Sequence, residues 1–162
     1  PKQISMMISS KNTGFGTSIY IQIPRVKQPV PLLVVFRALG VISDKEICEK
    51  IILDIDESKY KKMKYGLQGS IVEANTIMTQ EDAIKHLMTY VMFTPINMDK
   101  EAGLKKKYEF TMDILNNDLF PHCHDETQKI YFLGYMTNKL LKCSFEWTLP
   151  DDRDSYLNKR IE

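Results

Sequence analysis

The sequence has few of the features that mark secreted, membrane-spanning or disulfide-stapled proteins. Its 162 residues contain only three cysteines, an odd number at wide spacing that favours reduced thiols: Cys48, Cys123 and Cys143. The longest clean apolar run, residues 32–36, is far too short to cross a bilayer, and residues 1–20 lack the basic-then-apolar order of a signal peptide. These absences predict an intracellular protein.

The chain also lacks a large net charge. It carries 22 basic and 21 acidic residues, a formal net charge of +1, so no global field draws it onto nucleic acid or anionic lipid. Any contact with a polyanion must be local. The best candidate is residues 56–66, although a solvated helix face has the same pattern and stays an open interpretation. This stretch interleaves lysines with tyrosines: Lys59, Tyr60, Lys61, Lys62, Lys64 and Tyr65.

Residue types that occur in catalytic, phosphate-binding and metal sites are present, but their spacing does not match the known motifs for such sites. Gly14 and Gly16 lack the third glycine and the Lys-Ser/Thr end of a phosphate-binding loop. A zinc site needs four ligands, and the adjacent residues 122–124, His-Cys-His, have no second pair nearby. The acidic residues at 151, 152 and 154 surround Arg153, which favours a charge-paired turn over a magnesium site. We predict no catalytic, cofactor or metal residue here, although convergence of His122, His124 and Asp125 would support an independent enzyme.

What the sequence does contain is an ordinary globular composition, 43% apolar and 27% charged, in a chain of single-domain length. Alternating apolar residues at 4–8 and 18–23 flank a turn-rich stretch and predict a β-hairpin. Helices are expected at about 44–53, 79–94, 101–117 and 127–147, the first two capped by Ser43 and Thr79. The expected fold is α+β and mainly α-helical, with the hairpin packed on a helical core.

Two of these helices have apolar stripes at spacings of three and four that we assign to the core. One stripe consists of Ile84, Leu87, Met88, Val91 and Met92, and its helix is expected to end near Thr94, before Pro95. The other consists of Leu104, Tyr108, Met112, Leu115 and Leu119, with lysines 105–107 mostly on the outer faces.

Residues 29–40, PVPLLVVFRALG, are the most apolar stretch, and we predict a short buried helix there. Pro31 fits the first turn of a helix, and Gly40 fits the left-handed residue that ends one. Arg37 is the single charge. Because an unpaired buried guanidinium is very costly, we expect a nearby carboxylate or a row of carbonyls to pair with it. A structural role is favoured over ligand contact. In the last helix Gly134 is expected to permit close approach of another backbone.

Four blocks of the sequence, in this order, carry a resemblance to a known family: IYIQIPRVKQPVPLLVVFRALGVISDKEI, LFPHC, YFLGYMTNKLL and DDRDSYLNKR. The chain resembles the lobe domain of the second-largest subunit of eukaryotic-type multisubunit DNA-directed RNA polymerases. Its divergence is compatible with a viral or a divergent eukaryotic source. Leu157 departs from the glycine common at its position. The resemblance implies a lobe at residues 1–149, incomplete at its start so that the hairpin lacks a partner strand, and a segment at 150–162 returning toward the neighbouring protrusion.

The resemblance further implies a complete enzyme that makes RNA on a DNA template with Mg²⁺ held mainly by the largest subunit. This fragment would hold no cofactor and would serve as an architectural wall of the DNA cleft. Its implied partners are the largest subunit, a small subunit on the lobe, an initiation factor and weakly bound DNA. The implied location is the nucleus, or the cytoplasm or virion if the source is a virus. Arg153, Lys159 and Arg160 are candidate DNA-channel or interdomain contacts. The alternative is an independent helical protein-interaction module unrelated to polymerase.

The near-neutral charge generates a first prediction. We expect the chain to bind duplex DNA weakly, without sequence preference, and with an affinity that falls steeply as salt rises, because only local lysine patches can replace counterions. Fluorescence anisotropy on two unrelated duplexes at several salt concentrations measures this. Tight binding to one sequence alone would contradict the architectural role.

Overall fold

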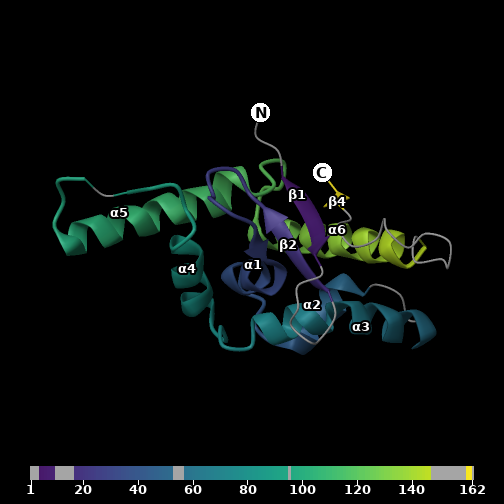
Figure 1. Ribbon diagram of the computed structural model, residues 1–162. Coiled ribbons are helices and arrows are strands. Elements are labelled where there is room, and N and C mark those ends of the chain that lie inside the picture. The colour runs from purple at the N-terminus through teal and green to yellow at the C-terminus, as the bar shows by residue number, and fades with distance from the viewer. Residues whose placement is uncertain (1–3, 10–16, 53–56, 95, 147–159, 162) are drawn as a thin grey trace.

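The computed structural model describes residues 4–9, 17–52, 57–94, 96–146 and 160–161. Within these ranges the chain forms a four-stranded antiparallel sheet, six α-helices and one π-helical turn, which confirms the mainly helical α+β fold. In Figure 1 α1 lies at the centre, with α4 and α5 on one side of it and α6 on the other. None of the described helices is both long enough and apolar enough to cross a membrane.

The sheet is built on the predicted hairpin, β1 (Ser5–Ser9) and β2 (Ser18–Gln22). Its strand order is β3-β2-β1-β4, in which β3 is Val30–Pro31 and β4 is Arg160–Ile161. The expectation that the hairpin lacks a partner strand is therefore wrong, because each of its strands has an antiparallel neighbour. A return of the chain more than 150 residues later supplies the outer partner, which local sequence patterns do not reveal.

Helix α1 (Leu32–Ala38) is buried at every position and confirms the short buried helix expected there. Pro31 lies just before the first turn and not within it, since it ends β3 and caps the helix. Gly40 has φ 106°, a left-handed conformation that L side chains rarely adopt. The Val41 N–H then donates to the Phe36 carbonyl at 3.0 Å, so the turn closes the end of the helix.

Helix α2 (Asp44–Ile51) begins at the predicted cap, where the Ser43 hydroxyl accepts a hydrogen bond from the Glu46 N–H at 3.1 Å. It packs against α6 (Glu126–Glu146), the long helix expected at 127–147. The Asn138 side-chain amide on α6 donates to the carbonyl of Ile51 at 2.9 Å. The α6 face toward the core includes Leu133, Met136, Thr137, Leu140 and Leu141.

Helix α3 (Glu57–Glu73) includes the predicted lysine-tyrosine stretch and continues beyond it to pack against β2. The buried Ser70 hydroxyl accepts a hydrogen bond from the Ile19 N–H at 2.9 Å. The Tyr20 hydroxyl donates to the Glu73 carboxylate at 2.6 Å. Burial and this carboxylate together raise the pKa of Tyr20. The contacts lie at the C-terminal part of α3, whereas Lys61 and Lys64 nearer its start are exposed.

The region from α4 to the π-helical turn differs most from the sequence prediction. Helix α4 (Gln80–Met88) begins at Thr79 as expected but ends six residues before Thr94, and Met92 beyond it is exposed. Val91 is buried through an isolated antiparallel bridge to Val26 and not through a helical stripe. Helix α5 (Lys100–Asp113) continues into η1 (Ile114–Asp118). Only the second half of its stripe is core, because Leu104 and Tyr108 are exposed.

The contact between α6 and the end of α2 generates a second prediction. A Cβ at Gly134 would lie 2.2 Å from the Lys50 carbonyl oxygen, a backbone atom that cannot move alone. Helix propensity by itself favours Gly134→Ala by about 1 kcal/mol. We expect the opposite sign, a loss of about 1 to 3 kcal/mol in the free energy of unfolding, because the two helices must separate.

Urea melts of Gly134→Ala measure this loss. The matched control is Tyr131→Ala on the exposed side of the same helix, where a small change is expected. A stabilised Gly134→Ala would contradict the close approach.

Candidate functional site

The Arg37 guanidinium is fully buried and every nitrogen has a partner. Its Nε donates to the Ile42 carbonyl at 2.8 Å, and Nη1 donates to the carbonyls of Ala74 and Ile77 at 2.6 and 2.9 Å. Nη2 forms an ion pair with Asp44. Both kinds of partner that the sequence left open, a carboxylate and a row of carbonyls, are present. The cluster joins α1 to the start of α2 and to the turn after α3.

A second buried cation, Lys129 at the start of α6, was missed by the sequence analysis. Its ammonium donates to the carbonyls of Asn116, Leu119 and Phe120, which belong to η1 and the turn that follows. Burial lowers the pKa of Lys129 below its ordinary value. The sequence around Lys129 does not predict this site, because the acceptors are main-chain carbonyls about ten residues before Lys129. Its geometry is that of a structural brace.

Arg25 holds the C-terminal part of α5 to the rest of the domain. Its side chain forms ion pairs with Asp113 at 2.7 Å and Asp118 at 2.5 Å and lies over the Phe110 ring, 4.8 Å from its centroid. These bonds raise the pKa of Arg25. Phe93 packs against Phe110 as well, with ring centroids 5.2 Å apart. The brace ends there, and the N-terminal half of α5 extends away from the body (Figure 1).

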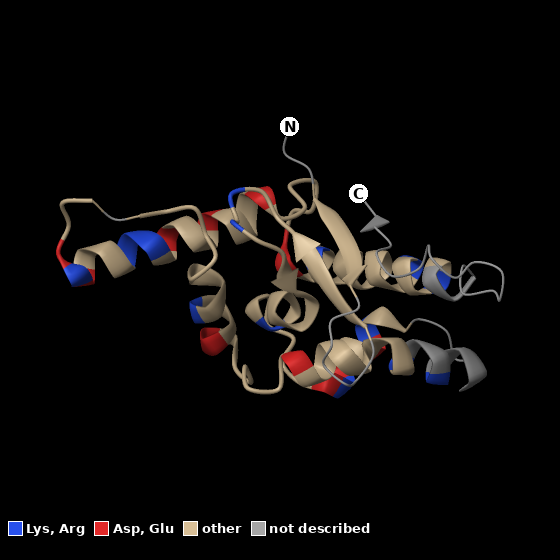
Figure 2. Cartoon of the chain, in the orientation of Figure 1, with Lys and Arg blue, Asp and Glu red and all other residues tan. Residues whose placement is uncertain are grey.

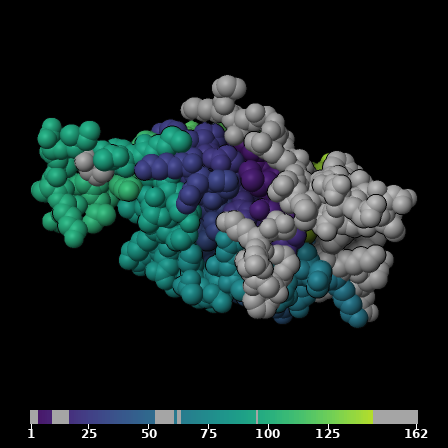
Figure 3. All heavy atoms as spheres, in the orientation of Figure 1, coloured from purple at the N-terminus to yellow at the C-terminus, as the bar shows by residue number. Residues whose placement is uncertain are grey.

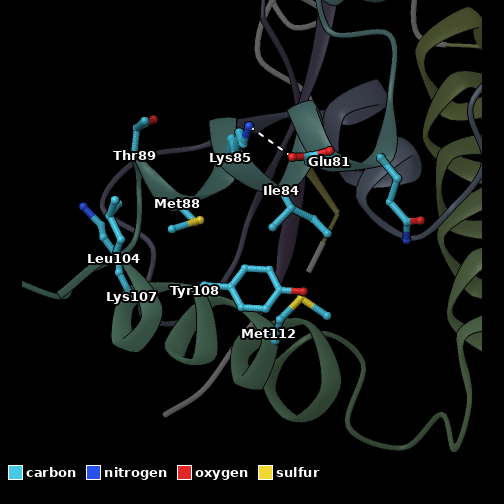
Figure 4. A pocket seen from close by; sticks show the side chains of 10 residues that line it. Glu81, Ile84, Lys85, Met88, Thr89, Leu104, Lys107, Tyr108 and Met112 are labelled. Atoms are coloured by element: carbon cyan, nitrogen blue, oxygen red, sulfur yellow. Dashed lines mark ion pairs between the residues drawn. The ribbon is translucent and has the colours of Figure 1, made fainter. Parts of the chain in front are cut away.

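Between α4 and the middle of α5 lies an open groove of about 700 Å³. Figure 4 shows Ile84 and Met88 of α4 facing Tyr108 and Met112 of α5 across it, with Leu104 at one end. Leu104 and Tyr108 are 54% and 46% exposed. The sequence assigned all five side chains to core stripes. The prediction is confirmed for Ile84 and Met88, which are buried, and Met112 is half-buried against the core. It is wrong for Leu104 and Tyr108, which are exposed, so one edge of these two helix faces remains open as the groove.

The charges at the groove are unequal on its two walls. On the α4 wall Lys85 pairs with Glu81 at 3.2 Å, so this wall is close to neutral. Lys107 on the α5 wall has no ion-pair partner among the residues that the structure describes, whereas its neighbour Lys106 reaches Glu109 at 3.7 Å. Figure 2 shows the resulting basic band in the middle of α5. The groove therefore combines apolar walls with one uncompensated positive charge.

The other sequence-predicted residues do not converge on a site. His122 packs edge-on against Phe132, with ring centroids 4.7 Å apart. Asp125 accepts a hydrogen bond from the Gln128 N–H at 2.8 Å, while the Gln128 side chain accepts one from the His124 N–H at 2.7 Å. In the described ranges, no group of three His, Cys, Asp or Glu residues could hold a metal ion.

Of the three candidate DNA-channel residues, only Arg160 lies within the described ranges. Arg153 and Lys159 lie outside the described residues. The backbone of Arg160 lies in β4, where it pairs with Met7 of β1. The role of all three in contacting DNA or a neighbouring domain stays a prediction.

Comparison with known proteins gives a match over almost the whole chain. Residues 3–162 match the model of the family described as RNA polymerase Rpb2, domain 2. The chain belongs to this family. The Rpb2 domain 2 assignment agrees with the lobe of the second-largest polymerase subunit that the four sequence blocks indicated, and it excludes a module unrelated to polymerase.

Individual relatives come from plants, microsporidia and viruses. The chain is 32% identical to DNA-directed RNA polymerase II subunit 2 of Arabidopsis thaliana, with 95% of the chain covered. It is 35% identical over 89% of its length to DNA-directed RNA polymerase II subunit RPB2 of Encephalitozoon cuniculi. It is 30% identical over 90% to DNA-directed RNA polymerase subunit 2 of Acanthamoeba polyphaga mimivirus. The matched region is only 12 to 13% of each relative.

The Arg37 cluster of this Rpb2-family domain generates a third prediction. Arg37→Met removes the charge and leaves buried carbonyls without donors, and we expect a loss of about 3 to 5 kcal/mol in the free energy of unfolding. Arg37→Ala should cost more, because it also leaves a cavity. Denaturant melts compare the two variants.

The control is Asp44→Asn. The Asp44 side chain is 44% exposed, and an Asn oxygen can still accept from Nη2 while the three carbonyls remain, so the loss should be smaller than in Arg37→Met. Equal losses in Arg37→Met and Asp44→Asn would show that the ion pair, and not the row of carbonyls, dominates the cluster.

Proposed function

We propose that the chain is a non-catalytic, architectural domain of the second-largest subunit of a DNA-directed RNA polymerase. In this role it lines one side of the DNA cleft and provides a docking surface for a small subunit or an initiation factor. The observation that carries the proposal is the family match across residues 3–162. The relatives that share this match are named as polymerase subunits.

The internal contacts support an architectural role. The Arg37 cluster fastens α1 to α2 and to the turn after α3, the Lys129 brace fastens η1 to α6, and Arg25 fastens η1 and α5 to the loop after β2. Arg37 and Arg25 join segments distant in sequence, and Lys129 joins two consecutive elements, in each case through buried or partly buried polar groups. Such clusters are costly to break. A domain held in this way can keep a wall in a fixed position beside a moving duplex.

The charge distribution supports weak contact with DNA and not specific recognition. The net charge is +1, and the exposed Lys61 and Lys64 on α3 offer only a local basic surface. The complete enzyme would make RNA from nucleoside triphosphates, with Mg²⁺ held mainly by its largest subunit. Its location would be the nucleus, or the cytoplasm or virion if the source is a virus.

The proposed division of the chain follows from the resemblance of its four sequence blocks to the polymerase lobe. Residues 1–149 would form the lobe, and residues 150–162 would lead back toward the neighbouring protrusion. Arg160 reaches the edge of the sheet next to Met7, so the last part of the chain runs along the same sheet as the first.

The fourth prediction tests membership in an assembled enzyme. We expect the tagged protein that contains this chain, purified from its native cells, to carry a largest polymerase subunit and smaller companions in equal amounts by quantitative mass spectrometry. An unrelated protein with the same tag is the control. Recovery of the tagged protein alone would refute the polymerase role.

A further inference from the structure

Exposed apolar side chains are concentrated in one segment of this domain. Six of the nine large apolar side chains that are exposed among the described residues lie between residues 78 and 108, which include α4 and the N-terminal half of α5. They are Met78, Met92, Ile96, Met98, Leu104 and Tyr108. Figure 3 shows the α5 part of this segment as a projection from the body of the molecule. Two of them, Leu104 and Tyr108, line the groove between α4 and α5. Exposed apolar side chains that share one groove mark an interaction site.

The groove between α4 and α5 has an apolar lining suited to the apolar face of a helix. Its volume is about 700 Å³, which is within the range of about 300 to 1,000 Å³ found for small-molecule pockets and gives room for apolar side chains of a partner. Its two walls are helix faces that carry Ile84 and Met88 on one side and Tyr108 and Met112 on the other (Figure 4). Methionine side chains adapt to the shape of a partner, and Tyr is enriched among residues that dominate binding energy.

The charge at the groove favours a partner helix that carries acidic side chains beside its apolar face. Glu81 and Lys85 neutralise each other on the α4 wall, whereas Lys107 on the α5 wall has no carboxylate partner within the described part of the chain. A partner with a carboxylate beside its apolar face would complete an ion pair with Lys107, and a basic partner would be repelled.

We propose that the α4–α5 groove binds an amphipathic helix of another protein of the polymerase assembly. This helix carries apolar anchors at spacings of three and four residues and acidic side chains beside them. The inference rests on the proposed function for the source of the helix. It goes beyond that function by naming the surface and the chemistry of the partner.

The fifth prediction uses the assembled complex. A photoreactive phenylalanine analogue replaces the exposed Leu104, the complex is purified and irradiated, and the crosslinked peptide is mapped by mass spectrometry. We expect one main crosslink, to an acidic amphipathic helix of another polymerase-associated protein. A crosslink to a basic segment, to a second copy of this chain or to nucleic acid would overturn the proposal.

Three variants in the crosslinking background then test the contacts. Tyr108→Asp should lower the crosslink yield at least tenfold, because it places a charge in the apolar groove. Lys107→Glu should lower the yield about two- to fivefold at low salt and less at high salt. Tyr65→Asp on α3 is the matched control, since Tyr65 is 78% exposed and outside the groove, and it should leave the yield unchanged. Equal yields in all three variants would overturn the proposal.

The same preparation separates the two hypotheses. If the largest subunit is present and Leu104 gives no crosslink, the groove inference fails and the polymerase role stands. If the largest subunit is absent, the polymerase role fails, together with the inference that rests on it. Thermal melts of each variant show that the domain remains folded.

Discussion

A buried guanidinium is the constraint on which the centre of this domain depends. Arg37 lies in the most apolar helix of the chain, where an unpaired charge would be prohibitive, so α1 can be buried only if four partners surround it. Three of them are main-chain carbonyls from two turns, at residue 42 and at residues 74 and 77. The positions of α2, of the end of α3 and of the loop before α4 are therefore coupled to one side chain.

The periphery is organised differently. Arg25 and Lys129 fix the C-terminal half of α5, η1 and the start of α6, but these braces end before the N-terminal half of α5. The middle of α5, from Leu104 to Met112, faces α4 across an apolar groove that no described segment fills. A domain with a tightly cross-linked centre and an open apolar groove at its edge suits a part of a larger assembly, because the centre fixes the position of the groove.

Much of the fold could be predicted from local patterns, and the errors have physical causes. The hairpin, the caps at Ser43 and Thr79 and the helices near 44–53 and 127–147 depend on residues close in sequence. The apolar stripe of α5 predicted its helix correctly, but periodicity shows only that a face is apolar and not what covers it. Leu104 and Tyr108 are on the predicted face and still exposed, because α4 ends at Met88 and no other described segment covers them.

The sequence by itself determined the family, the helical character and the need for a partner at Arg37, because these follow from ordered motifs, short-range spacing and the cost of burying a charge. Only the tertiary structure decided which atoms met that need, how β4 completes the sheet, and where the apolar groove lies. The reason is common to all three. Main-chain carbonyls exist at every residue, and strand edges and helix faces have many potential partners, so the choice among them depends on the packing of distant segments.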